Sequence, residues 1–86
     1  MELVYYKKFI KAYEKLSPKQ QDKVEQIITI FRQNPHDPRL CNHVLHGDQK
    51  GRRAISAGGD LRLVFREKNH YEKVTFLLVG THNQVY

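Results

Sequence analysis

Residues 51–66 read Gly51-Arg52-Arg53-Ala54-Ile55-Ser56-Ala57-Gly58-Gly59-Asp60-Leu61-Arg62-Leu63-Val64-Phe65-Arg66, and the rest of the fold is built around them. Two runs with strand-forming composition, 53–57 and 61–66, flank the turn residues 58–60, which predicts a β-hairpin. Positions 53 and 62 are expected to lie almost opposite one another on the two strands. Two guanidinium groups so placed repel each other unless an anion lies between them. The hairpin therefore predicts both a sheet and an anion site.

The chain downstream of the hairpin predicts a buried strand and an exposed end. Residues 67–70 form a second turn signal, and residues 73–79 are the most apolar run, which predicts a strand inside the sheet. The chain then closes with Gly80-Thr81-His82-Asn83-Gln84-Val85-Tyr86. Because His82 comes just past a buried strand, its ring is expected at the end of the sheet and outside the core.

Two amphipathic helices are predicted upstream. Apolar residues recur at helical spacing from about Lys7, and the expected buried stripe consists of Phe9, Ile10, Tyr13 and Leu16. Ser17-Pro18-Lys19-Gln20 is a helix start with a capping-box pattern. The second helix is expected over Pro18–Gln33, before Asn34-Pro35, and its expected buried residues are Val24, Ile27, Ile28 and Phe31.

The remaining segments complete an α+β prediction. Residues 2–5 predict an edge strand. Residues 36–50 lack periodicity and predict a loop that Leu40 and Leu45 pin to the core. At 86 residues the chain is a single domain, 1–86. We expect a small, mostly antiparallel β-sheet with an N-terminal helical hairpin packed on one face.

Composition narrows the class of protein. Cys41 is the only cysteine, so neither a disulfide framework nor a cysteine metal cluster is expected. No apolar run approaches the ~18 residues of a membrane span, and the N-terminus does not resemble a signal peptide. A soluble, cytoplasmic protein without a membrane partner is the expectation.

The charge distribution favours an anionic partner. The formal net charge is +6, and residues 50–66 alone hold five basic side chains against one aspartate. A surface kept basic only for solubility would spread this charge more evenly, so a functional anion site is preferred over a solvated basic face. For Arg52 and Arg66 the sequence does not favour either role, an anion contact or a solvated surface charge.

Several side chains could carry phosphoryl-transfer chemistry. An imidazole such as that of His82 can give or take a proton near neutral pH, although a lone terminal histidine is more often only exposed. The phenol of Tyr86, four residues on, either plugs the core or shares a site with His82. Arginine suits phosphate contact, which favours Arg53 and Arg62. Asp60 defaults to a structural role in its turn, with orientation of a histidine or arginine as the functional alternative.

His43 and His46 are spaced as metal ligands can be, but no cysteine or carboxylate spacing supports a metal site. One of these histidines is expected to anchor the loop or to line the site. No cofactor and no metal are expected.

Together these motifs resemble the RelE/ParE toxin superfamily, and most closely its YafQ-like branch. The resemblance covers essentially the whole chain, behind a lysine-rich helical hairpin with Leu16-Ser17-Pro18. It rests on Leu40…His43-x-Leu45-x-Gly47…Lys50-Gly51-x-Arg53…Gly59-Asp60-x-Arg62-Leu63-Val64-Phe65…Val79-Gly80-Thr81-His82…Tyr86.

The resemblance implies a toxin of a type II toxin–antitoxin system that cuts mRNA on the ribosome and is silenced by a cognate antitoxin. It implies a metal-independent endoribonuclease in which the RNA 2′-OH attacks the adjacent phosphate. By this resemblance His43, Asp60 and His82 match catalytic positions of the YafQ-like branch, and Tyr86 matches its terminal aromatic residue. Arg53, Arg62 and Tyr86 match positions that RelE fills with a basic residue, an arginine and a tyrosine. Arg62 is the expected charge stabiliser, and Lys50 and Arg53 the expected phosphate contacts.

The chain departs from this branch at three positions. Ser56 stands where a histidine is usual, Leu61 where a tryptophan is usual, and Leu78 where an arginine is usual. Arg62 is expected to replace the missing positive charge from the neighbouring strand. Two alternatives stay open: a DNA gyrase poison of the ParE type, and a basic RNA- or ribosome-binding domain with little or no activity.

Overall fold

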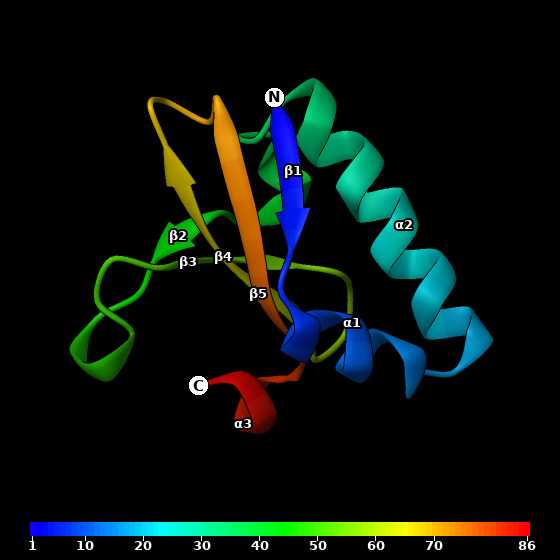
Figure 1. The fold of residues 1–86 in the computed structure, drawn as a ribbon. Helices are drawn as coiled ribbons and strands as arrows, with labels where there is room; N and C mark the ends of the chain where they lie inside the picture. Colours follow the sequence, from blue (N-terminus) through cyan, green and yellow to red (C-terminus); the bar gives the residue numbers. More distant parts are fainter.

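A computed structural model describes residues 1–86 and shows a five-stranded sheet with two long helices on one side (Figure 1). The elements in chain order are β1 (Glu2–Tyr5), α1 (Lys7–Glu14), α2 (Pro18–Gln33), the 3-10 helix η1 (Pro38–Leu40), β2 (His43–Val44), the 3-10 helix η2 (Gly47–Gln49), β3 (Arg53–Ser56), β4 (Leu61–Lys68), β5 (Lys73–Thr81) and α3 (His82–Val85). The α+β prediction is confirmed.

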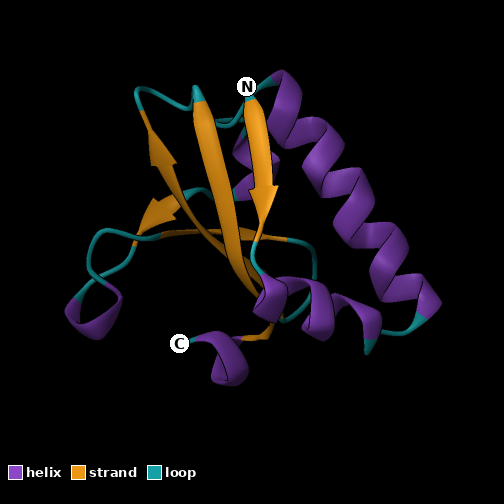
Figure 2. Ribbon diagram, in the orientation of Figure 1, coloured by secondary structure: helices purple, strands orange, loops and turns teal.

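The sheet has the strand order β1-β5-β4-β3-β2. All neighbouring pairs are antiparallel except β1 and β5, which run parallel (Figure 2). The apolar strand β5 lies between β1 and β4, and β1 lies at the edge, as the sequence predicts. The crossover from β1 through α1 and α2 places both helices on the same face.

The main core lies between this face and the helices. Phe9 from α1 and Val24 and Phe31 from α2 pack in one buried cluster with residues of the sheet. The residues that the sheet and the β3–β4 turn contribute to that cluster are Ile55, Ala57, Leu61, Leu63, Phe65, Val74, Phe76 and Val79. Phe31 sits at its centre, with its ring 5.0 Å from that of Phe65 and 5.6 Å from that of Phe76. Burial of these apolar surfaces is the main stabilising term.

The start of α2 is the predicted capping box. The backbone N–H of Gln20 donates to Ser17 Oγ at 3.2 Å, and the backbone N–H of Ser17 donates to Gln20 Oε1 at 3.1 Å. These bonds satisfy backbone groups that a helix end otherwise leaves without partners.

Replacing Ser17 by alanine is expected to destabilise the fold by about 0.5–2 kcal/mol, because one cap acceptor is lost. The matched control is Thr29→Ala, which removes another exposed hydroxyl from α2; this hydroxyl donates only to the Glu25 carbonyl within the helix. Thermal unfolding of both variants measures the difference. Equal melting temperatures for the two variants would contradict the cap assignment.

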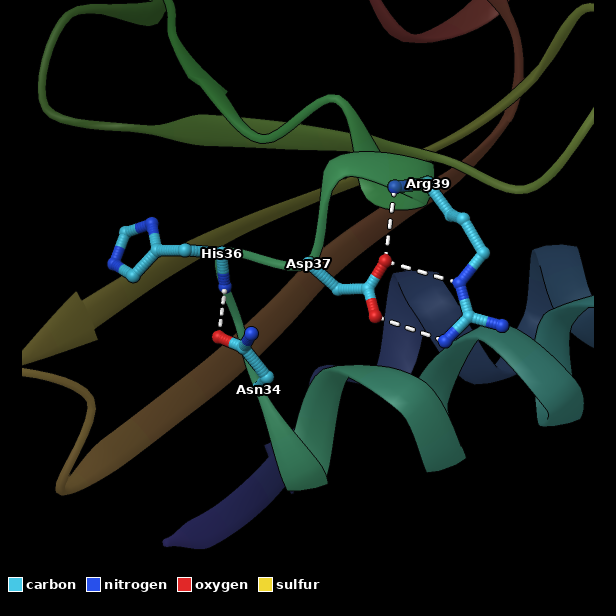
Figure 3. A network of polar contacts seen from close by, with 4 residues as sticks. All are labelled: Asn34, His36, Asp37 and Arg39. Carbon is cyan, nitrogen blue, oxygen red and sulfur yellow. Dashed lines mark hydrogen bonds and ion pairs between the residues drawn. The ribbon is translucent and has the colours of Figure 1, made fainter.

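A short polar network follows the end of α2 (Figure 3). Asn34 Oδ1 accepts the His36 amide at 3.0 Å, and Asp37 accepts both the amide and the guanidinium of Arg39. The side-chain bonds from Arg39, followed by its backbone bond, lower the pKa of Asp37 to about 2. This network turns the chain into η1, whose Leu40 is buried in the core as predicted.

Three details differ from the sequence predictions. Ile10 is 46% exposed, because α1 presents Phe9 to the sheet and leaves the adjacent position outward. Residues 36–50 are not only a loop, since β2 adds a two-residue strand to β3. The chain also ends in the single helical turn α3, which the sequence analysis did not predict.

Candidate functional site

The strand register gathers the site residues on the face of the sheet away from α1 and α2. Residues paired across strands share a face. His43 pairs with Ala54, Ala54 with Val64, and Val64 with Leu78. In the neighbouring row, Ser56 pairs with Arg62, and Arg62 with Gly80. His43 and Arg62 therefore come from different strands but face the same side.

The C-terminal turn folds back over this face. Val85 of α3 is buried against Ala54, Val64 and Leu77. Gly80 makes the approach possible: a Cβ at this position would lie 2.7 Å from Gln84 Oε1 and 3.2 Å from Gln84 Cβ. A side chain there would have to push the Gln84 side chain, whose Oε1 accepts the Thr81 backbone N–H at the start of α3, out of its position. The His82 amide also donates to the Asp60 carbonyl at 3.1 Å, which ties α3 to the β3–β4 turn.

The Tyr86 ring lies near the rings of both His43 and His82. Its ring centroid is 4.4 Å from that of His82, with the rings nearly perpendicular, and 6.5 Å from that of His43. His43 Nδ1 is 2.9 Å from the Cys41 carbonyl oxygen. When Nδ1 carries the proton it donates to that carbonyl, and Nε2 is left as the acceptor. The fold thus brings His43 close to the C-terminal residues 82–86, which lie far from it in the sequence.

The phenol of Tyr86 is partly buried, and its pKa reflects this. Burial raises the pKa above its ordinary value of 10.0, while the positive charge of Arg62 acts in the opposite direction. The net shift is upward, so the phenol keeps its proton at neutral pH. Tyr86 can donate a hydrogen bond there but cannot act as a base.

The Arg62 side chain is held in place by hydrogen bonds from one of its guanidinium nitrogen atoms. Its Nη1 donates to the Gly59 and Leu61 carbonyls at 2.9 Å each and lies 3.2 Å from Ser56 Oγ. Its Nε and Nη2 donate to no protein group. A fixed guanidinium with free donors is suited to an anionic oxygen.

Arg53 does not face Arg62, so this sequence prediction is wrong. Arg53 pairs with Phe65, and Arg62 pairs with Ser56, so the two arginines lie on opposite faces of the sheet. The Arg53 guanidinium instead donates to Asn42 Oδ1 at 2.8 Å. Asn42 in turn donates to the Pro35 carbonyl and to the Tyr71 hydroxyl. Arg53 thereby holds the segment that leads into His43.

Asp60 and Lys50 lie at the margins of the cluster. Asp60 is exposed in the hairpin turn, and its carboxylate has no hydrogen-bond partner. Lys50 is exposed just after η2, whose Gln49 side chain donates to the Val85 carbonyl at 2.8 Å. The segment carrying Lys50 is thus bonded to α3, while its ammonium group makes no hydrogen bond or ion pair within the protein.

The three departures from the YafQ-like pattern fall in two environments. Ser56 and Leu78 lie on the face that carries the cluster, where Ser56 is a partner of Arg62. Leu61 points to the other face and is 4% exposed in the main core. This face therefore carries a serine in place of a histidine and a leucine in place of an arginine, while the third departure replaces a tryptophan by a core leucine.

Two glutamines that position the site were missed by the sequence analysis. Gln84 Oε1 accepts the Thr81 amide at 2.8 Å at the start of α3, and Gln49 joins η2 to the end of α3. Thr81…Gln84 repeats the T-x-x-Q spacing of a capping box, so the signal that located α2 at Ser17 was present here as well. Nothing in the sequence marks Gln49.

Two classes of feature are absent from this fold. No three His, Cys, Asp or Glu side chains are grouped as a metal ion would require. None of the helices combines the length and the apolar character needed to cross a membrane.

Comparison with known proteins gives one family match and several structural relatives. A family model described as a bacterial toxin of a type II toxin–antitoxin system, YafQ, matches residues 1–86. YafQ from Escherichia coli strain BL21(DE3) is 22% identical, with a TM-score of 0.80 over 99% of this chain and 97% of that one. No curated protein matches.

Two further structures share the fold. HP0894 from Helicobacter pylori is 24% identical, with a TM-score of 0.75 over 100% of this chain and 99% of that one. The toxin–antitoxin complex RelBE2 from Mycobacterium tuberculosis contains a chain that is 18% identical, with a TM-score of 0.77 over 94% of this chain and 96% of that one.

Proposed function

This chain belongs to the YafQ family of bacterial type II toxin–antitoxin toxins, and from that membership we propose that it is an endoribonuclease that cuts mRNA on the ribosome and so inhibits translation. The observation that carries the proposal is the cluster of His82, Tyr86 and His43 beside Arg62. These are the residue types that phosphoryl transfer needs, and they share the face of the sheet not covered by α1 and α2.

The proposed reaction needs two proton transfers and one charge stabiliser. The RNA 2′-oxygen bonds to the adjacent phosphorus while the bond to the 5′-oxygen of the next nucleotide breaks. One imidazole takes the 2′ proton, and the other gives a proton to the departing 5′-oxygen; His43 and His82 fill these roles. The free Nε and Nη2 donors of Arg62 stabilise the negative charge that grows on the phosphoryl oxygens. No metal takes part in this scheme.

The other candidate residues act around this centre. Tyr86 stacks on a base of the substrate and keeps His82 in place. Asp60 orients α3 through its backbone and assists the proton work with its carboxylate. Lys50 contacts backbone phosphate. Arg53 is assigned to positioning, since its guanidinium holds the segment before His43 through Asn42.

A protein partner also follows from the family. Solved structures include the Escherichia coli DinJ–YafQ toxin–antitoxin complex and RelBE2, and we propose that this toxin likewise has a cognate antitoxin in the cytoplasm. The net charge of +6 suits a segment of opposite charge that orders as it binds.

The experiment that tests the activity is a cell-free translation reaction with one translated and one untranslated message. Cuts confined to the translated message, at codon-periodic positions, are the expected result. Cuts in both messages would contradict ribosome dependence. Intact messages together with growth arrest in cells would favour a gyrase poison, for which a DNA supercoiling assay is the next measurement.

Tyr86→Phe is expected to keep cleavage close to the wild-type rate, whereas Tyr86→Ala is expected to cost about 1–3 kcal/mol through lost base stacking. The phenylalanine retains the ring next to His82 and removes only the hydroxyl, which bonds to no protein group in this structure. Single-turnover cleavage rates of the two variants give the comparison. Equal losses in both variants would instead make the phenol proton part of the chemistry.

A further inference from the structure

Two adjoining hollows lie on the helix side of α3 and form one groove. The larger, of about 520 Å³, lies between α1 and α3, and Lys8 and Lys15 line it. The smaller, of about 260 Å³, lies between the start of α2 and the hairpin turn, and Lys19 and Lys23 line it. Gln20, Leu61 and Thr81 line both hollows. We call this continuous feature the lysine groove.

The charges of the lysine groove have no partners in the protein. The molecule's one ion pair joins Arg39 to Asp37, so none of the four lysines is paired. Asp60 is the one acidic side chain in the lining. Lys23 Nζ lies over the hairpin turn, 3.3 Å from where a Cβ on Gly58 would be. Four unpaired cations around a concave surface produce a local positive potential that attracts an anion.

The groove also offers apolar surface and borders the helical turn α3. Ala12 and Leu16 of α1 and Val79 of β5 line the larger hollow. Gly80, Thr81 and Gln84 line it too, and they flank His82 in the chain. The groove therefore borders α3, the element that carries His82.

A groove lined by cationic and apolar side chains suits single-stranded nucleic acid, because its phosphates bind the cations and its bases pack on the apolar surface. We propose that the lysine groove binds the stretch of substrate RNA next to the scissile bond, with Lys8, Lys15, Lys19 and Lys23 at its phosphates. This inference rests on the proposed function, because it takes the substrate to be RNA. It adds a substrate-binding segment, on the other side of α3, to the catalytic cluster.

The test measures binding separately from cleavage. The probe is a ten-nucleotide RNA in which every 2′-hydroxyl is methylated, so that no nucleophile is present. The double variant Lys8→Ala/Lys15→Ala is compared with Lys7→Ala/Lys11→Ala, which removes the same charge from exposed positions of α1 outside the groove. Binding is measured by fluorescence anisotropy over a range of salt concentrations.

The groove variant is expected to bind more weakly, with the slope of log affinity against log salt smaller by about 1.4, since each phosphate contact on a single strand contributes about 0.7. The control variant is expected to keep the wild-type slope. Equal slopes in the two variants would overturn the proposal. Because the probe cannot be cleaved, the result is independent of whether the protein is a nuclease.

A second arm separates substrate RNA from ribosomal RNA. Both variants are sedimented with ribosomes that carry no message. Co-sedimentation of the groove variant at the wild-type level, together with its weaker oligonucleotide binding, supports the proposal. Loss of co-sedimentation with unchanged oligonucleotide binding would assign the groove to the ribosome and overturn the substrate assignment.

Discussion

Replacing His82 by alanine is expected to lower the rate of RNA cleavage by about 10²–10⁴-fold, the usual contribution of a positioned general acid or base. His82 is exposed at the start of α3, and its side chain makes no hydrogen bond. The substitution therefore removes the proposed proton-transfer group together with its packing against the Tyr86 ring, and it breaks no side-chain hydrogen bond. Single-turnover cleavage in a translation reaction measures the effect.

A matched control separates the loss of a catalytic group from the effect of replacing any exposed histidine. His70 is exposed in the β4–β5 turn with a φ of 55°, a backbone conformation that asparagine tolerates, so His70→Asn is the control substitution. It is expected to cleave at the wild-type rate. Wild-type activity in His82→Ala, with unchanged melting temperature, would remove His82 from the mechanism.

Arg62→Ala is the second large effect, with an expected loss of about 10²–10³-fold in cleavage rate, as for removal of one stabiliser of transition-state charge. Arg62→Lys is expected to recover little, because an ammonium group cannot reproduce the fork that bonds Gly59 and Leu61 on one side and leaves donors free on the other.

The control for Arg62 is Arg66→Ala. Arg66 lies on the same strand and the same face, four residues along β4, and its guanidinium contacts Tyr6 instead of the catalytic cluster. Both substitutions remove one positive charge from β4. If Arg62→Ala cleaved as fast as Arg66→Ala, Arg62 would not compensate for the missing basic residue at position 78.

Most of the fold could be predicted because local signals and the apolar pattern agree. The capping box at Ser17 and the Asn34-Pro35 stop gave the bounds of α2, and the glycine pair gave the β3–β4 turn. The packing of Leu40 and Leu45 onto the core could also be predicted, because they are apolar residues in an otherwise polar segment; Leu40 lies in the main core, and Leu45 packs on the smaller cluster. Each of these features depends on a short stretch of neighbouring residues.

The sequence predictions that are wrong concern features that depend on how separate strands pair with one another. Arg53 and Arg62 were placed opposite one another from the turn alone, but the pairing of Arg53 with Phe65 puts them on opposite faces. A shift of one residue in register reverses the face of a side chain. The short strand β2 exists only because β3 is beside it, so its two residues carry no signal of their own.

In the candidate site, too, contacts between sequence neighbours could be predicted and contacts between distant residues could not. His82 and Tyr86 are four residues apart and could be joined from the sequence, whereas the approach of His43 depends on the β2–β3 pairing and on Val85 packing over Ala54. The lysine groove combines side chains of α1, α2, the hairpin turn and α3, a set that only the folded chain brings together.

In the proposed reaction this site cuts RNA by attack of the 2′-oxygen, with His82 as a proton-transfer group. Its most direct test is the chemistry of the new RNA ends made by the wild type and by His82→Ala in a translation reaction. We expect the wild type to leave a 2′,3′-cyclic phosphate on the upstream fragment and a 5′-hydroxyl on the downstream fragment, and the variant to form neither. A 3′-hydroxyl and a 5′-phosphate, or the same ends formed equally fast by His82→Ala, would contradict it.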